Sequence, residues 1–292
     1  MPITIDNGML SLTVDTLGAQ MMSLKRHGTE YLWQGDPKYW GDRAPILFPF
    51  IARLTNDSYK FMGKQYPMTI HGFANASEFA VASQEADRLV LELRSSEKTL
   101  VQYPIDFVFR VIFRLDGDAL HTTYHVENRS DVIMPFGIGG HPGFRVPVGE
   151  QETFEDYYLE FSLECQPDRV GFTPAVYLSG QDAAYPLEEG KRISLRHDLF
   201  DEDAIILKNM AREVSLRSKV SSHSVTVSYP KMPYLGIWHW PHTDAPYICI
   251  EPWSSLPSRQ DVVEELSCKS DLVQLESGCV YDNTWTITIG GE

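Results

Sequence analysis

The chain has 292 residues, of which 43% are hydrophobic and 22% are charged, as is ordinary for a globular protein with a sizeable core. Its formal net charge at pH 7 is -15. A surface this acidic repels phosphate backbones and anionic lipids, so we expect neither nucleic acid nor a membrane as a partner. The N-terminus lacks the basic and apolar segments of a signal peptide, and the four cysteines form no C-x-x-C pair. We therefore expect reduced thiols and a cytoplasmic protein.

Alternation of apolar and polar residues is the dominant local pattern, and it predicts antiparallel strands. The first hairpin turns at Asn7–Gly8, a dipeptide typical of a type I′ turn. A long pair follows, in which one strand runs up to Asp116–Gly117 and the next returns from it. The strands predicted beyond the first hairpin are 89–93, 107–115, 120–126, 224–229, 247–251 and 284–289.

Helical patterns are few. Ser258, with Asp261 three positions on, resembles a capping box and predicts a short helix through Leu266. Residues 95–101 are predicted to form another turn or two. No strand–helix–strand rhythm, linker or internal repeat divides the chain. We therefore predict an all-β fold, in which residues 1–292 form one domain of two large, packed antiparallel sheets with a few short helices.

The segment "GIGGHPGFRVP", residues 137–147, places one histidine among four glycines and two prolines. Pro142 biases His141 towards an extended conformation. Gly139 and Gly140 permit backbone angles and close approaches that other residues forbid. The segment predicts an imidazole fixed at a strand end, with a ligand close to the backbone. The alternative is a buried histidine that is hydrogen-bonded at a tight turn.

The segment "YICIEPW", residues 247–253, delivers Glu251 at the end of an apolar strand. A carboxyl group that is partly removed from water has a raised pKa, which suits a general base. The alternative is a structural ion pair with an arginine. Trp253 suits either stacking on a sugar or a place in the core, and the roles of Trp238 and His239 are open.

Three further features are candidates for ligand binding. His71 stands before Gly72 where a strand breaks into a loop, and Arg53 follows a fully apolar run. Such an arginine either protrudes into a pocket or pairs with an acid, because burial without a partner is costly. The acidic turn 201–203 precedes an apolar strand and is equally explained as a solvated turn.

A metal site is a weak prediction from this sequence. His239 and His242 are three positions apart, Pro241 intervenes, and no carboxylate stands at a matching distance. We therefore expect no metal, although these two histidines leave a metal-dependent, cupin-like enzyme as an alternative.

Taken together and in this order, these segments resemble the aldose 1-epimerase (galactose mutarotase-like) family, and more closely its bacterial LacX-type branch. The resemblance extends over essentially the whole chain, and "GGHPGF" and "IEPW" are its most specific parts. It implies a β-supersandwich that interconverts the α and β anomers of a free hexose without a cofactor. The other matching segments are "EYLWQGDPKYW", "APILFPFIARL", "HGFA", "CIEPWSS" and "LESGCVYDNTWTITI".

The resemblance also assigns roles. Glu251 matches the general base and His141 the general acid, and we expect the two on either side of the sugar hemiacetal. His71 and Arg53 match positions that hold sugar oxygens. An aspartate before a strand binds sugar hydroxyls in this family. We select the second aspartate of the acidic turn, Asp203, and the first, Asp201, remains the alternative.

The resemblance is incomplete at the acid. Galactose mutarotases carry an Asn-His-Ser/Thr-Tyr-Phe type of motif there, whereas this chain has "GGHPGF", so the natural sugar stays open. One rival function is a hexose-6-phosphate 1-epimerase, for which Arg43 and Arg145 are candidate phosphate ligands. Another rival is a non-catalytic sugar-binding module. We expect a small-molecule sugar as the partner, and a monomer or a homodimer.

Overall fold

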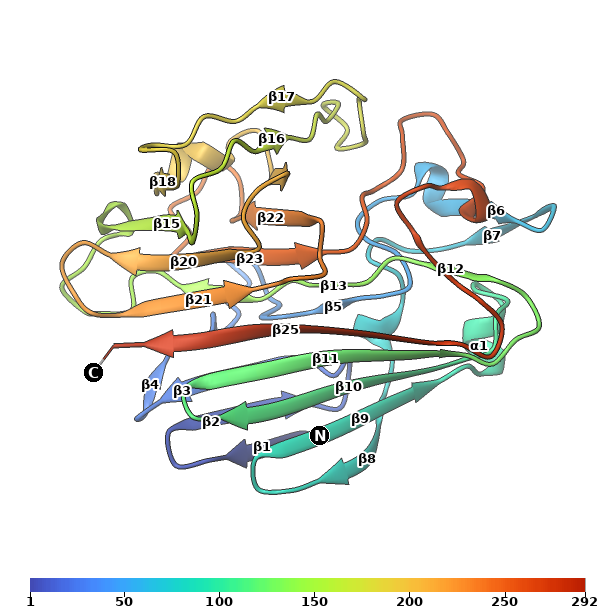
Figure 1. The fold of residues 1–292 in the computed structure, drawn as a ribbon, viewed down its shortest axis with the longest axis horizontal. Coiled ribbons are helices and arrows are strands. Elements are labelled where there is room, and N and C mark those ends of the chain that lie inside the picture. The colour runs from blue at the N-terminus through green and yellow to red at the C-terminus, as the bar shows by residue number, and fades with distance from the viewer. Residues whose placement is uncertain (292) are drawn as a thin grey trace.

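The computed structural model describes residues 1–291 and is built mainly from antiparallel strands arranged in two large sheets (Figure 1). The larger sheet has nine strands. In spatial order these are β18 (Arg192–Ser194), β15 (Tyr157–Phe161), β20 (Glu213–Ser218), β21 (Ser224–Ser228), β25 (Val280–Gly290), β11 (Ala119–Asn128), β10 (Phe107–Asp116), β9 (Arg88–Arg94) and β8 (Ala80–Gln84).

The second sheet has eight strands, several of them short. In spatial order these are β17 (Ala183–Ala184), β16 (Asp168–Arg169), β19 (Ile205–Lys208), β22 (Tyr234–Trp238), β23 (Tyr247–Trp253), β13 (Gly139–Gly140) and β5 (Ile46–Leu47), and β14 (Gly143–Arg145) also pairs with β23.

Smaller elements complete the fold. One four-stranded sheet consists of β1 (Pro2–Asp6), β2 (Leu10–Asp15), β3 (Met21–Arg26) and β4 (Thr29–Glu30). Two pairs stand apart: β6 (Ser58–Phe61) with β7 (Lys64–Pro67), and β12 (Met134–Phe136) with β24 (Val273–Leu275). The helices are α1 (Glu97–Leu100) and the 3₁₀ turns η1 (Thr55–Asp57), η2 (Ala74–Ala76), η3 (Phe154–Asp156), η4 (His197–Phe200) and η5 (Leu266–Cys268). Within residues 1–291, no helix has the length and apolar character needed to span a bilayer.

The predicted all-β class and every predicted strand beyond the first hairpin are confirmed. The predicted turn at 95–101 is confirmed as α1, which begins after Ser96 with a capping box. The prediction of a type I′ turn at Asn7–Gly8 is wrong. Of these two residues only Gly8 has a positive φ (85°), whereas a type I′ turn requires a positive φ at both. The single-domain boundary remains a prediction.

The helix predicted from Ser258 to Leu266 is also wrong. The Ser258 hydroxyl is buried and accepts the backbone N–H of Thr55 at 2.8 Å, so it caps no helix. Asp261 has φ 60°, which a helix interior excludes. Only η5 forms, at the far end of the predicted range.

The two large sheets pack face to face around one core, and strand β23 contributes side chains to that core from one of its faces. All seven of its residues are buried. Ile248 and Ile250 belong to the main core cluster, together with residues of the nine-stranded sheet such as Trp285. Since strand side chains alternate between faces, the face opposite the core presents Cys249, Glu251 and Trp253. Strand β23, inside the second sheet, therefore carries a buried carboxyl group on the face that points away from the main core.

Candidate active site

Strand register brings Glu251 and His141 together. Gly139 pairs with Trp253, and Gly143 pairs with Cys249. His141 lies midway between the two glycines, just as Glu251 lies midway between their partners. The antiparallel ladder therefore sets the two side chains opposite each other across neighbouring strands.

The glycines before His141 are required by close approach, because neither has a positive φ. A Cβ atom on Gly140 would lie 2.8 Å from the Trp285 ring of the nine-stranded sheet. A Cβ atom on Gly139 would lie 2.8 Å from the carbonyl oxygen of Pro252. The close approach at these two glycines is made by the protein's own Pro252 and Trp285, and it fixes His141 against both sheets. The expected ligand beside this backbone stays a prediction.

The two functional groups lie side by side: Nε2 of His141 is 3.3 Å from Oε2 of Glu251. Their side chains are 11% and 2% exposed, and Oε2 of Glu251 and Nδ1 of His141 have no hydrogen-bond partner within residues 1–291. Burial raises the pKa of Glu251 well above the ordinary carboxyl value. Burial also lowers the pKa of His141 well below the ordinary imidazole value, with a further contribution from His71. Both shifts have the same cause, because burial penalises whichever form is charged.

Aromatic rings enclose the imidazole of His141. The ring of Trp40 stacks on it with centroids 4.9 Å apart, and Trp238 meets it edge-on at 5.6 Å. Trp40 comes from the loop after β4, about a hundred positions away in the sequence. Sequence reasoning gave Trp40 no role, although it lies in a segment that matched the family, and it left Trp238 open. These contacts hold the ring in one plane.

A cavity of about 530 Å³, here called the catalytic cavity, opens in front of the pair. The predicted residues Arg53, His71, His141, Asp203 and Glu251 all line it. The other lining residues are Trp40, Ala52, Ile70, Val176, Ala204, Trp238, Trp240, Pro241, His242 and Trp253. The structure thus brings together five candidates that are spread over nearly two hundred positions of the chain.

Arg53 protrudes into the cavity and makes no ion pair within residues 1–291, so the structural-pairing alternative is not observed. His71 is fixed from behind, because the backbone N–H of Ala52 donates to its Nδ1 at 3.1 Å. The neutral ring then carries its proton on Nε2. Burial, with a contribution from Arg53, lowers the pKa of His71 to about 4. Arg53 and His71 therefore offer hydrogen-bond donors at neutral pH.

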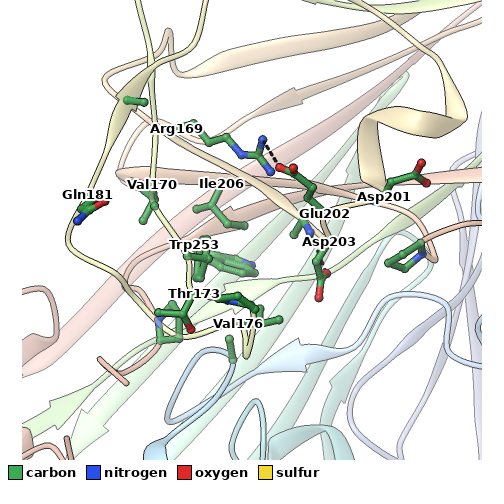
Figure 2. Close-up of a pocket in the computed structure, with 18 residues that line it drawn as sticks. Arg169, Val170, Thr173, Val176, Gln181, Asp201, Glu202, Asp203, Ile206 and Trp253 are labelled. Atoms are coloured by element: carbon green, nitrogen blue, oxygen red, sulfur yellow. Dashed lines mark hydrogen bonds and ion pairs between the residues drawn. The ribbon is translucent and has the colours of Figure 1, made fainter. Parts of the chain in front are cut away.

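The two aspartates of the acidic turn 201–203 lie in different surroundings. Asp203 lines the catalytic cavity, and its Oδ1 accepts the backbone N–H of Ala204 at 2.8 Å. Asp201 lies 3.2 Å from Nδ1 of His242 and does not line that cavity. Figure 2 shows the two carboxylates pointing in different directions. The geometry therefore favours Asp203 for contact with a ligand of the catalytic cavity.

The histidines that suggested a metal do not converge. His239 is buried and bonds to Nδ1 of His197 at 3.1 Å, whereas the His242 side chain is 73% exposed. A different set comes closer, because ligand atoms of His141, Cys249 and Glu251 lie within 4.8 Å of one another. These three residues could reach a metal ion, but two of them are the groups placed for proton transfer.

The cations suggested for phosphate binding lie elsewhere. A guanidinium nitrogen of Arg43 donates to Oε1 of Gln34 at 3.0 Å, and neither Arg43 nor Arg145 lines the catalytic cavity. Among the lining residues that the structure describes, Arg53 is the one arginine, and no lysine joins it.

Comparison with known proteins agrees with this architecture. The model of the family described as "Aldose 1-epimerase" matches residues 1–264. The chain therefore belongs to the aldose 1-epimerase family. It is 36% identical over 298 aligned residues to the plasmid-encoded protein LacX of Lactococcus lactis subsp. lactis, with 99% of each chain covered.

Solved structures give the same assignment and confirm the galactose mutarotase-like fold. A galactose mutarotase related enzyme from Lactobacillus acidophilus superposes with a TM-score of 0.94 at 34% identity, covering 99% of this chain and 97% of that one. A galactose mutarotase-like protein from Lactobacillus casei gives 0.92 at 31% identity, covering 99% and 100%.

Proposed function

We propose that this protein is an aldose 1-epimerase that interconverts the anomers of a free aldose by general acid–base catalysis. The observation that carries the proposal is the buried pair of His141 and Glu251, 3.3 Å apart at the floor of a cavity. Membership of the family supports the same reaction class. Pure binding has no need of two groups with oppositely shifted pKa values, which are typical of catalytic sites.

The geometry suits the two proton transfers that ring opening requires. A base removes the proton of the C1 hydroxyl while an acid protonates the ring oxygen. The sequence predicted the base and the acid on either side of the hemiacetal, whereas His141 and Glu251 lie side by side. The C1 hydroxyl oxygen and the ring oxygen are both bonded to C1, so two adjacent groups can reach both oxygens. Glu251 serves as the base and His141 as the acid. Rotation about the C1–C2 bond then presents the other aldehyde face, and the same groups close the ring with roles reversed.

The pKa shifts strengthen both groups in these roles, although burial keeps the resting pair as a neutral carboxyl and a neutral imidazole. Burial makes the Glu251 carboxylate more basic and the His141 imidazolium more acidic than free side chains, so each proton transfer is easier. The neutral resting pair and the reactive carboxylate–imidazolium pair contain the same number of protons. They differ only by one proton moved between Oε2 and Nε2, so reaction needs no proton from solvent.

Substrate binding would shift the equilibrium between the neutral pair and the carboxylate–imidazolium pair towards the charged pair. No donor within the described residues 1–291 reaches Oε2 of Glu251, and a sugar hydroxyl placed beside it would stabilise the carboxylate. Arg53 and His71 would hold other sugar oxygens from the cavity wall, and Asp203 would accept from a hydroxyl. Arg53 acts as a fixed donor, because a guanidinium keeps its proton throughout. The site therefore needs no cofactor for this chemistry.

The test is anomer relaxation measured by NMR across a panel of aldoses and their 6-phosphates. We expect the protein to accelerate relaxation of at least one neutral aldose, and Glu251→Gln to lower kcat by at least about a hundredfold. Near wild-type exchange by Glu251→Gln on every sugar that binds would leave a sugar-binding module as the function. Activity confined to the 6-phosphates would establish the phosphate-specific rival.

A further inference from the structure

The catalytic cavity shares lining residues with a second cavity of about 690 Å³, here called the outer chamber. Figure 2 shows the residues that line the outer chamber. The residues that line both cavities are Ala52, Val176, Asp203, Ala204, Pro241 and Trp253. Each volume lies within the range of about 300–1,000 Å³ that is usual for a complete small-molecule site. A single hexose at the catalytic pair would therefore leave the outer chamber unfilled.

The outer chamber has the surface that a sugar ring requires. Phe172, Val170, Ile206 and Trp253 form an apolar cluster on one side of it. Polar residues, among them Thr173 and Gln181, also line it. A pyranose presents apolar C–H faces and a rim of hydroxyls, so an apolar plate bordered by polar groups matches its shape and polarity.

The charges of the outer chamber favour a neutral ligand. Its lining contains three carboxylates, Asp201, Glu202 and Asp203, but one guanidinium, Arg169. Arg169 is already paired with Glu202 at 3.6 Å, as Figure 2 shows. A phosphate would meet net negative charge there, whereas sugar hydroxyls can donate to the carboxylates. The chamber thus disfavours an anionic substituent on the substrate.

Strained backbone marks the boundary between the two cavities. Val176 (φ 63°) and Asp203 (φ 73°) are both left-handed and both line the two cavities. This conformation is costly for a β-branched residue. Val176 lies in the loop between Phe172 and Leu178, whose ends are joined by a β-bridge. Non-glycine strain of this kind is typical of ligand-contacting segments.

We propose that the outer chamber binds a second, neutral sugar unit, so that the preferred substrates are reducing disaccharides. This inference rests on the proposed function. The free anomeric carbon of the reducing unit would react at His141 and Glu251. The second unit would keep its glycosidic bond and lie against Phe172 and Trp253. Only the hemiacetal of the reducing unit opens and closes, so no co-reactant is needed.

The experiment compares sugars that share a reducing unit. Relaxation of glucose is measured beside maltose and lactose, and that of galactose beside 1,4-β-galactobiose, by NMR with the wild-type protein. We expect kcat/KM for at least one disaccharide to exceed that of its parent monosaccharide by about tenfold, because contacts remote from the reacting carbon assist the reaction.

Variants then locate the effect. Phe172→Ala removes part of the apolar plate, and Thr173→Trp fills the chamber. Each should lower the ratio of disaccharide to monosaccharide kcat/KM by about tenfold. Thr4→Trp, at an exposed position of strand β1, is the matched control and should leave the ratio unchanged. Circular dichroism checks folding, and the second variant serves if the first fails to fold.

The outcomes separate the two proposals. If monosaccharides relax rapidly but every disaccharide relaxes more slowly than its parent, the chamber binds no second sugar and the epimerase function stands. If the variants leave the ratio unchanged, any disaccharide preference arises elsewhere and the inference fails. If no sugar relaxes faster than in buffer, the proposed function fails. Saturation-transfer NMR with lactose then decides the chamber separately, because loss of the lactose signal in Thr173→Trp supports it and absence of any signal overturns it.

Discussion

Two regions of the molecule use β-strands for different purposes. Strands β10, β11 and β25 of the nine-stranded sheet are long and regular, and each alternates buried and more exposed residues. Around the catalytic pair, β13, β14 and β5 have two or three residues each, and β23 is buried on both faces. The regular strands contribute the apolar core, whereas the short ones place particular atoms. The second sheet thus carries the chemistry, whereas both sheets contribute to the core, because Ile248 and Ile250 of β23 also belong to it.

The largest expected effect is a loss of catalysis from substitutions at the catalytic pair. His141→Asn and Glu251→Gln should each lower kcat by at least about a hundredfold, with little change in thermal stability. The double variant should lose far less than the product of the single losses, because acid and base act as one unit. Single-turnover anomer exchange measures all three. Independent, multiplicative losses would mean that the two groups do not share the reaction.

A matched change in the regular sheet should do the opposite. Ile287 of β25 is fully buried and lies between Leu120 and Val227 on the neighbouring strands. Ile287→Ala should reduce the free energy of unfolding by about 2–5 kcal/mol, through lost burial and a residual cavity. Urea unfolding measures this. We expect kcat of the folded variant to stay within about twofold of wild type, and a larger loss would couple the regular sheet to the chemistry.

Arg53→Ala should affect binding more than chemistry. Arg53 offers fixed donors to the ligand and has no acidic partner in the described chain, so we expect KM to rise by about tenfold with a smaller change in kcat. Steady-state kinetics with the best aldose measures both. Arg43→Ala, outside the catalytic cavity, is the control. Unchanged KM and kcat would remove Arg53 from the substrate site.

The pH profile should be broader than free side chains would give. With ordinary pKa values of 4.5 and 6.5, activity would fall as pH rose above 6.5. Here the pair is active while it holds one shared proton. It gains a second proton only below the lowered pKa of His141, and loses its proton only above the raised pKa of Glu251. We expect a plateau through neutral pH, and a narrow optimum near 5.5 would contradict the shifts.

The smallest expected effect concerns metals. The proposed reaction consists of proton transfers, so exhaustive chelation should leave anomer exchange unchanged. Exchange is measured before and after dialysis against EDTA, with metal content checked by mass spectrometry. Loss of activity that one divalent ion restores would assign a metal to His141, Cys249 and Glu251, and Cys249→Ser would test that assignment.

Some of this organisation could be read from the sequence, because it depends on local rules. Alternation predicts the strands, and Pro142 predicts an extended His141. The helix expected at Ser258 was wrong because a long-range contact with Thr55 takes the hydroxyl that would have capped it. The choice between Asp203 and Asp201 depended on which side chain turned towards the cavity. The outer chamber depends on loops that meet only in the folded chain, and no local pattern reports them.

The packing of Gly140 has a consequence for how this protein can evolve. A methyl group at position 140 would collide with the ring of Trp285, and it would also crowd the hydroxyl of Tyr124 at 3.2 Å. Trp285 could become smaller only by opening a cavity in the core. Gly140 therefore tolerates no larger residue while Trp285 is present, and Trp285 tolerates no smaller residue while Gly140 is present. Evolution of a larger residue beside the proposed general acid would require substitutions at both positions 140 and 285. The single-substitution intermediate would have either a steric clash or a cavity in the core. This one contact makes position 140, directly before His141, resistant to single substitutions.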